Sequence, residues 1–308
     1  MATRSRPGFI NRSTEVDVVL QQVAELRSGV AAQKCLVNIY GVYGTGKSAL
    51  LEHLAERMSS FTDLRTLRIE IPALAPGEKT PSAEAKISII RQLHDDSQSD
   101  GSALREVLAA DVDKTESAGD AALERYAQLL FGLRQPIVLL INAESSGAPA
   151  AFVWLERGLL KPLVNAHCLV AVITSRKEVL WREFDTRNRA KSLTLSPFTV
   201  VQTAEQLAVA PESVTSIFAL TRGLPLANEL ARHMLAEAPN PQAWSVEQQI
   251  TLIQAIRDAI YARIGPELTS QLCCILEVLA VVREFDVLLM HQLVNRFCVS
   301  EGLTQSRG

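Results

Sequence analysis

The sequence predicts an α/β fold in which a parallel sheet carries helices on both faces and an all-helical region follows. Three observations support this prediction. Strand-like apolar runs alternate with segments of helical periodicity from about residue 14 to residue 198. The strand signal then ends near residue 200, and only helical patterns follow. A glycine-rich loop, GVYGTGKS at residues 41–48, joins the first expected strand to the next expected helix.

Helices and strands can be assigned in order along the first part of the chain. Apolar residues recur at helical spacing over residues 14–28, and Gly29 ends that helix. A strand is expected at 35–40, and the continuous apolar run at 136–142 is typical of a strand buried on both faces of a parallel sheet. The other expected strands cover 64–71, 167–176 and 191–196, and expected helices cover 48–60, 83–94 and 121–133. The predicted sheet therefore has about five strands.

The second part of the chain is predicted to be helical throughout. Amphipathic segments follow one another after residue 200, and the proline-containing stretch APNPQAW at 238–244 interrupts them. We expect a first domain at 1–198, a helical subdomain at 199–238 and a further helical part at 239–308.

The amino-acid composition and net charge limit the classes of protein to which this chain can belong. The 308 residues are 47% hydrophobic and 21% charged, as in ordinary globular proteins. A net charge of −3 argues against a generally basic nucleic-acid binder, so we do not expect this chain alone to bind nucleic acid. The apolar runs are shorter than the roughly 18 residues of a membrane span, which predicts a soluble, cytoplasmic protein. The five cysteines form no CxxC pair, so reduced thiols are expected and a structural metal is not.

The loop at 41–48 matches the phosphate-binding pattern G-x-x-x-x-G-K-[ST] at Gly41, Gly46, Lys47 and Ser48. The four fixed positions would match by chance with a probability of about 0.01 in a chain of this size. A strand-to-helix turn needs glycine but does not explain the lysine and serine that follow. The residues assigned to nucleotide binding here are Gly41, Gly44, Thr45, Gly46, Lys47, Ser48 and Ala49. Lys47 is expected to reach the β- and γ-phosphates, and Ser48 is expected to bind Mg²⁺.

An acidic residue usually follows a second buried strand in such sites and holds the metal through water. The strand at 136–142 ends instead on Asn142, and Ala143 and Glu144 follow. Asn142 can hold a metal-bound water but adds no negative charge, which predicts weak magnesium binding and slow hydrolysis. Glu144 is the nearby candidate for a catalytic base, although a solvated loop acid is an equal alternative.

Arg176 follows the expected strand at 167–176, in the segment ITSR. A guanidinium at this end of a strand faces the ligand edge of an open sheet, so Arg176 is a candidate sensor of the γ-phosphate. A surface arginine is the alternative. The charged tract 175–191 is interpreted as a solvated helix rather than a nucleic-acid surface.

Together with these elements, two further segments give a family resemblance. RGLPLANELA at 222–231 and FINRSTE at 9–15 resemble segments of the signal-transduction ATPases with numerous domains, the STAND class that includes NB-ARC proteins. The resemblance implies that Pro225 packs by the adenine and that Ile10 and Arg12 close the pocket from the other side. Asn11 stands where that family has glycine. The region from 265 resembles a partial winged-helix subdomain only in outline.

The resemblance implies a P-loop NTPase domain that binds ATP or ADP with Mg²⁺ and hydrolyses ATP slowly. Such a switch couples nucleotide state to domain rearrangement in signalling, defence or transcription regulation, with a protein partner or self-assembly. The alternatives are an AAA+-like DNA-associated or assembly ATPase, and a nucleotide-binding module without hydrolysis. The guanine-recognition pattern N-K-x-D is absent from the sequence, which favours adenine.

Overall fold

The computed structural model describes residues 12–30, 32–72, 81–96, 116–132, 135–144 and 148–264. Its parallel sheet contains β1 (Leu36–Tyr40), β2 (Arg65–Glu70), β3 (Ile137–Ala143), β4 (Leu169–Ser175) and β5 (Ala190–Thr194). The strand order is β2-β3-β4-β1-β5, and every neighbouring pair is parallel. The predicted α/β class and its parallel sheet are therefore confirmed.

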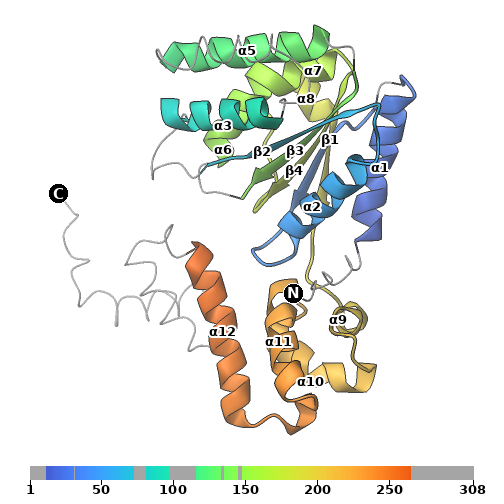
Figure 1. Ribbon diagram of the computed structural model, residues 1–308, viewed down its shortest axis with the longest axis vertical. Coiled ribbons are helices and arrows are strands. Elements are labelled where there is room, and N and C mark those ends of the chain that lie inside the picture. Colours follow the sequence, from blue (N-terminus) through green and yellow to red (C-terminus); the bar gives the residue numbers. More distant parts are fainter. Residues whose placement is uncertain are drawn as a thin grey trace, which may run out of the picture. The chain divides into compact units, whose positions relative to one another are not determined.

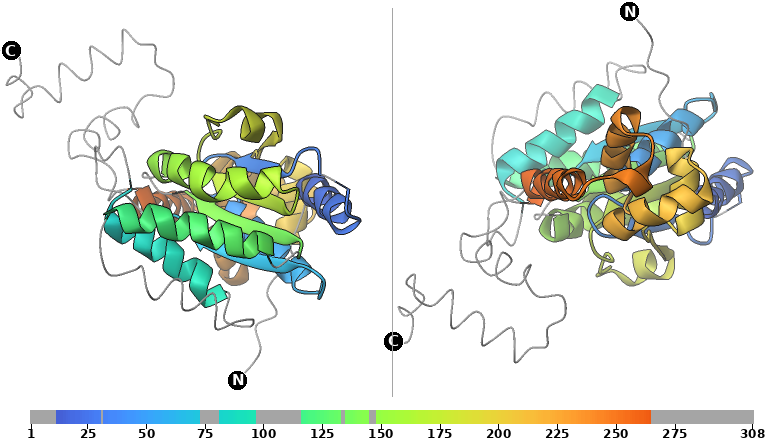
Figure 2. Two further views of the ribbon diagram at one scale, coloured as in Figure 1. Left: turned by 90° about the horizontal axis from the view of Figure 1, so that it is seen from above. Right: turned by 90° about the horizontal axis from the view of Figure 1, so that it is seen from below.

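Helices flank this sheet on both sides (Figure 1). Those of the first part are α1 (Ser13–Arg27), α2 (Lys47–Met58), α3 (Ala83–Asp96), α5 (Glu116–Gly132), α6 (Ala148–Leu155), α7 (Lys161–Asn165) and α8 (Phe184–Asn188). A π-helical segment, η1 (Glu156–Leu160), joins α6 to α7. In the left view of Figure 2, α3 (teal) and α5 (green) lie side by side.

The sheet order fixes which helices share a face. After β1, the chain crosses over the positions of β4 and β3 and forms β2 at the edge of the sheet. The next two strands, β3 and β4, then fill the positions between β2 and β1. Because connections between parallel strands are right-handed, α2 covers one face and the helices of the later connections cover the other. α2 packs on β3 and β4, while α3 packs on β2 and α7 on β4.

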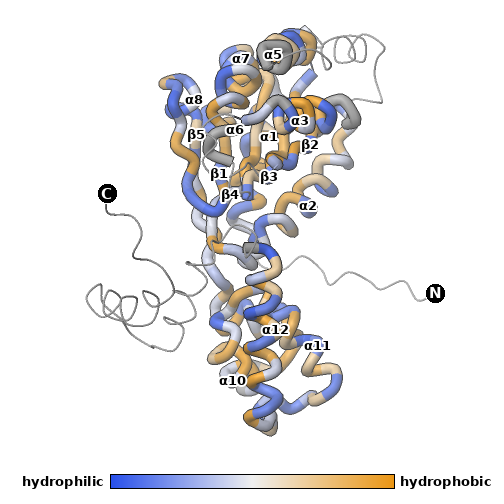
Figure 3. The backbone as a smooth tube through the Cα atoms, turned by 90° about the vertical axis from the view of Figure 1, so that its left-hand side faces the viewer, coloured by the Kyte–Doolittle hydropathy of each residue, from blue (hydrophilic) through white to orange (hydrophobic). Residues whose placement is uncertain are grey.

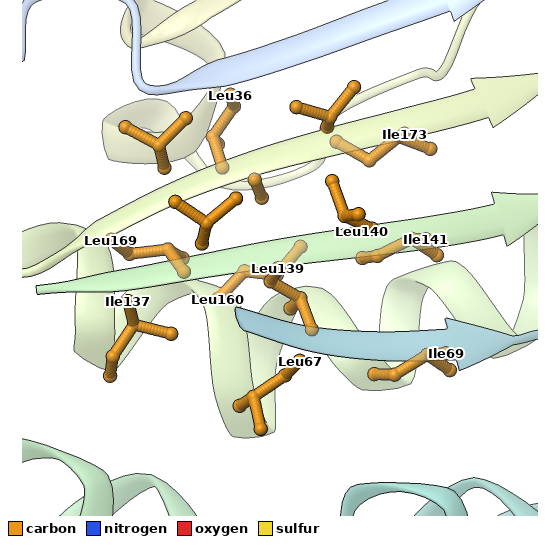
Figure 4. Packing of buried hydrophobic residues seen from close by; sticks show 14 of the residues in the cluster. Leu36, Leu67, Ile69, Ile137, Leu139, Leu140, Ile141, Leu160, Leu169 and Ile173 are labelled. Atoms are coloured by element: carbon orange, nitrogen blue, oxygen red, sulfur yellow. The ribbon is translucent and has the colours of Figure 1, made fainter. Parts of the chain in front are cut away.

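The core lies between the sheet and these helices. Figure 4 shows apolar side chains of neighbouring strands in contact, among them Leu67, Leu139 and Ile173. All residues of β4 are buried, and only Asn142 of β3 is partly exposed. This burial on both faces explains why both strands are continuous apolar runs, which are coloured as hydrophobic in Figure 3.

The charged tract 175–191 differs from its prediction. Only α8 (Phe184–Asn188) is helical, and the rest is the end of β4, loop and the beginning of β5. The buried carboxylate of Glu156 explains the short helix, because it accepts hydrogen bonds from the amides of Arg182 and Glu183 and from the Thr186 hydroxyl. A tertiary contact, rather than local periodicity, therefore sets the start of α8.

Beyond β5, α9 (Val200–Leu207), α10 (Pro211–Thr221) and α11 (Pro225–Glu237) pack against one another. Thr199 and Gln202 form a capping box at the start of α9. Between α10 and α11, Arg222 and Gly223 both have positive φ angles, of 52° and 70°, and these reverse the chain. The predicted helical character of this region is confirmed.

The short 3₁₀ turn η2 (Pro241–Ala243) follows, and the last described helix is α12 (Val246–Ile264). Residues up to Val246 form one compact unit, and α12 belongs almost entirely to a second. The domain boundaries expected at 198 and 238 remain predictions. The expected winged-helix region from 265 lies outside the described residues. Within the described part, no helix is long and apolar enough to cross a membrane.

Candidate functional site

The glycine-rich loop lies between β1 and α2, and its three glycines have different physical roles. A Cβ on Gly41 would lie 2.5 Å from the Leu195 carbonyl oxygen. The backbone that follows β5 therefore excludes a side chain at Gly41. Gly44 (φ 84°) packs under the side chains of Leu224 and Leu226. Gly46 has a φ of 92°, and a Cβ there would have no described atom within 4 Å. Open space above the backbone at Gly46 suits a ligand that approaches closely.

Gly46 is the N-cap residue of α2, and no side chain caps this helix. The amide groups of the first turn, which includes Lys47, Ser48 and Ala49, therefore have no side-chain acceptor at the helix start. Ser48 and Ala49 are exposed. A helix start of this kind, preceded by a glycine loop, is suited to bind phosphate.

The side chain of Lys47 folds back onto the glycine-rich loop. Its Nζ donates to the carbonyl oxygens of Gly41 at 2.8 Å and Val42 at 2.7 Å, and the residue is 2% exposed. Burial lowers the pKa of Lys47, the nearby Glu144 carboxylate opposes this shift, and the charge of Arg176 adds to it. The structure thus brings Lys47, Glu144 and Arg176 within electrostatic reach of one another.

The end of β3 contributes Asn142 and Glu144. Glu144 is 6% exposed, and its Oε1 lies 3.6 Å from Lys47 Nζ. The solvated-loop alternative for Glu144 is therefore wrong, because the carboxylate is buried against the loop lysine. The Oδ1 atom of Asn142 is buried and has no hydrogen-bond partner among the described residues. A buried carbonyl oxygen of this kind has spare capacity to accept from a ligand or water.

Arg176 follows β4, next to the loop, and is half-buried. The backbone joins the two segments, because the Gly41 amide donates to the Ser175 carbonyl at 3.2 Å. Asn38, buried in β1, fixes this turn: its Nδ2 donates to Ser175 Oγ at 2.8 Å, and its Oδ1 accepts from the Val179 amide at 3.0 Å. Sequence reasoning missed Asn38, although a polar residue inside the apolar run CLVNIY was a usable signal.

Arg12 contacts the protein backbone. Its Nη2 donates to the Thr45 carbonyl at 3.1 Å and to the Ser196 carbonyl at 2.7 Å. Thr45 is itself buried, and its hydroxyl donates to Val42. Ile10, the predicted partner of Arg12, lies outside the described residues.

Pro225 occupies the first turn of α11, and its carbonyl accepts from Gln206 Nε2 at 3.0 Å. The next residue makes the closer contact with the loop, since the Leu226 amide donates to the Gly44 carbonyl at 3.1 Å. The GLPLA segment and the glycine loop, distant in sequence, therefore meet through the backbone. Sequence reasoning assigned Pro225 but missed Leu224 and Leu226, whose apolar side chains have no distinctive pattern.

The residues present fit a hydrated Mg²⁺ ion. Ser48 is exposed in the first turn of α2, and Asn142 offers a buried oxygen without a described partner. Glu144 adds the negative charge that Asn142 lacks. Oxygen donors with water completing the shell suit magnesium.

Comparison with known proteins supports the fold. The sequence matches no protein-family model and no curated protein at a significant level. Among solved structures, the Orc1 protein of Aeropyrum pernix in complex with DNA is similar, with a TM-score of 0.52 and 16% identity over 98% of this chain and 81% of that chain. This chain has a P-loop NTPase fold.

Other solved structures are less similar. Cdc6p of Pyrobaculum aerophilum has a TM-score of 0.49 and 13% identity over 78% of this chain and 66% of that chain. Domain III of DnaA from Thermotoga maritima has a TM-score of 0.43 and 12% identity over 80% of this chain and 94% of that chain. Neither adds to the argument for the fold. None of these similarities supports the STAND class specifically.

Proposed function

We propose that this protein binds an adenine nucleotide with Mg²⁺ at the loop 41–48 and acts as a slow, AAA+-like ATPase. The observation that carries the proposal is the junction at Gly46. There an uncapped helix start, a positive φ and open space coincide with the buried charge of Lys47. A structural turn would need the backbone angle but neither the buried lysine nor the open approach.

The surrounding residues have distinct roles in this proposal. Lys47 exchanges its contacts with the Gly41 and Val42 carbonyls for phosphate oxygens and neutralises their charge. Glu144 orients a water molecule and accepts its proton. Arg176 stabilises the charge that develops on the transferred phosphoryl group. Mg²⁺, held through Ser48 and water on Asn142, would neutralise phosphate charge.

Hydrolysis is expected to be slow because Asn142 is neutral and Ala143 follows it. The same two residues favour a second candidate function, a nucleotide-binding module that does not hydrolyse ATP. A third, the STAND-type switch, draws support from the contact between the GLPLA segment and the loop. In all three, nucleotide binding at the loop is expected to influence α11 through the Leu226 amide.

The first prediction tests nucleotide binding itself. Lys47→Ala should weaken ATP binding by about 10- to 100-fold, because hydrogen bonds to a charged group are lost. Isothermal titration with ATP, ADP and GTP in the presence of Mg²⁺ measures this. Lys34→Ala is the matched control, since Lys34 is exposed and its Nζ donates to the Asn188 carbonyl.

Circular dichroism and thermal unfolding establish that both variants fold. Unchanged ATP affinity in a folded Lys47→Ala protein contradicts nucleotide binding at this loop. GTP binding as tight as ATP binding contradicts the adenine assignment.

A further inference from the structure

Arg12 makes four contacts although it precedes the first described helix. The residue is 8% exposed, and its Nη2 donates to the carbonyls of Thr45 and Ser196. Its Nη1 lies 3.7 Å from Glu15 Oε1, and the guanidinium carbon lies 4.6 Å from the centre of the Phe198 ring. Such a set of contacts holds the planar guanidinium in one orientation.

The two carbonyls belong to segments with different roles. Thr45 immediately precedes Gly46, the N-cap of α2, so its peptide group lies within the proposed phosphate-binding loop. Ser196 lies in the connector from β5 to α9, the stretch of chain that leads from the sheet into the helical subdomain. A displacement of the loop that moves the Thr45 carbonyl therefore also acts on the connector through one side chain.

The connector is in turn joined to the helical subdomain. The Phe198 amide donates to the Gly223 carbonyl at 2.8 Å. Gly223 is the first residue of the GLPLA segment, in which the Leu226 amide donates to the Gly44 carbonyl at 3.1 Å. Loop, Arg12, connector and α11 thus form a closed circuit of hydrogen bonds, which we call the Arg12 circuit.

We propose that Arg12 is a positioning residue that couples the glycine loop to the helical subdomain, and that it acts on the backbone rather than on the adenine. The coupling to nucleotide rests on the proposed function. Burial lowers the pKa of Arg12 and the charge of Glu15 opposes this shift, but a guanidinium stays charged in proteins. Its removal therefore leaves two backbone carbonyls without this donor.

Amide hydrogen exchange of the full chain tests the circuit without nucleotide. Arg12→Ala should accelerate exchange at the amides of Phe198 and Leu226 by about 10-fold or more, because both depend on contacts that Arg12 holds in place. The Ile137 amide, which donates to the Cys168 carbonyl in the sheet, is the internal reference for global stability. Equal acceleration at Ile137 means general destabilisation and overturns the proposal.

Arg27→Ala is the matched control variant. Arg27 lies in the last turn of α1, pairs with Asp63 at 2.7 Å and lies over the Phe61 ring at 4.3 Å, and none of these described contacts involves the loop or the connector. This variant should leave the exchange of Phe198 and Leu226 unchanged. Unchanged exchange of both amides in Arg12→Ala overturns the proposal.

A second arm adds ATP with Mg²⁺. Nucleotide should change the exchange of the Leu226 amide in the wild type and in Arg27→Ala, and this response should be lost in Arg12→Ala even at saturating ATP. A full response in Arg12→Ala overturns the coupling role. If the wild type shows no ATP binding by titration, the proposed function fails, while the arm without nucleotide still decides whether Arg12 holds the circuit.

If Arg12→Ala does not fold, Arg12→Lys replaces it in the exchange experiment. Lysine keeps the charge but lacks the planar fork that bridges carbonyls while stacking on a ring. An acceleration of several-fold at Phe198 and Leu226, with Ile137 unchanged, supports the proposal, and wild-type exchange contradicts it.

Discussion

Asn142 and Glu144 lie on the same strand end but have opposite environments. Glu144 has a charged partner in Lys47, whereas Asn142 has a buried oxygen without a described partner. The negative charge near the loop therefore comes from Glu144. The Glu144 carboxylate also pairs with Lys47 when no nucleotide is bound, so an incoming phosphate must compete with it for the lysine.

The second prediction separates these two residues. Asn142→Asp should increase magnesium affinity or ATP turnover by about 10-fold, because it adds charge beside the metal's water shell. Phosphate release is measured at several Mg²⁺ concentrations, with Lys47→Ala as the blank.

Glu144→Gln keeps the shape of the side chain and should reduce phosphate release to that blank while ATP affinity stays equal or rises. Should neither substitution alter magnesium dependence or rate, the end of β3 does not face the nucleotide, and the protein is a binding module.

The third prediction concerns Cys35, which is 2% exposed. Burial raises the pKa of Cys35 from 9.0 to about 11, against an opposing effect of Arg189. The unfolded chain loses this proton from about pH 9, but the folded chain keeps it until about pH 11. Stability should therefore fall across this window, by up to about 3 kcal/mol from this thiol.

Urea unfolding at pH 8 and pH 10.5 measures this loss. Cys35→Ala should be less stable at pH 8 but should lose less stability between the two pH values than the wild type. Equal losses in both proteins would show that the thiol is not protected from ionisation.

At the scale of elements, the turn between α10 and α11 depends on Gly223. Its φ is 70°, and a Cβ there would lie 2.0 Å from the Phe198 carbonyl oxygen. Neither the angle nor the space tolerates a side chain.

The fourth prediction follows from this turn. Gly223→Ala should destabilise the protein by about 2 kcal/mol or more, since the backbone at Phe198 must move. Gly132→Ala is the control, because no described atom lies within 4 Å of its Cβ position at the end of α5. That substitution should be neutral or stabilise by up to about 1 kcal/mol. Similar unfolding midpoints in urea for both variants would contradict the steric argument.

Local pattern was sufficient to predict the elements but not the contacts between them. The five strands and the loop are predictable, because continuous apolar runs and glycine spacing are local properties of the sequence. The partners of Arg12 were not predictable, because only the strand order brings Thr45 and Ser196 close enough for one side chain to contact both. Likewise the helical connection between β3 and β4 is divided by η1, where Gly158 lets Leu123 of α5 approach closely.

For the whole molecule, the AAA+-like interpretation and the binding-module interpretation differ in self-assembly. The fifth prediction is that ATP with Mg²⁺ makes the protein assemble, so that the molar mass of the particles in solution rises. ADP should not cause this rise, and neither should ATP added to the Lys47→Ala variant. Size-exclusion chromatography with light scattering measures this, and adding duplex DNA tests the expectation that this chain alone does not bind nucleic acid. A constant mass with every nucleotide would favour the binding module.

The strand order also determines when the candidate site is completed during synthesis. β1 pairs with β4 and β5, and the loop that follows β1 receives hydrogen bonds from Arg12 and from the Leu226 amide. Contacts that join distant parts of a chain form late, because a long intervening segment must first be ordered. A nascent chain that has left the ribosome only as far as β3 carries the whole GVYGTGKS motif. It still lacks the β4 and β5 strands that flank β1 and the α11 turn that contacts Gly44. The proposed nucleotide site is therefore complete only after translation has passed Leu226.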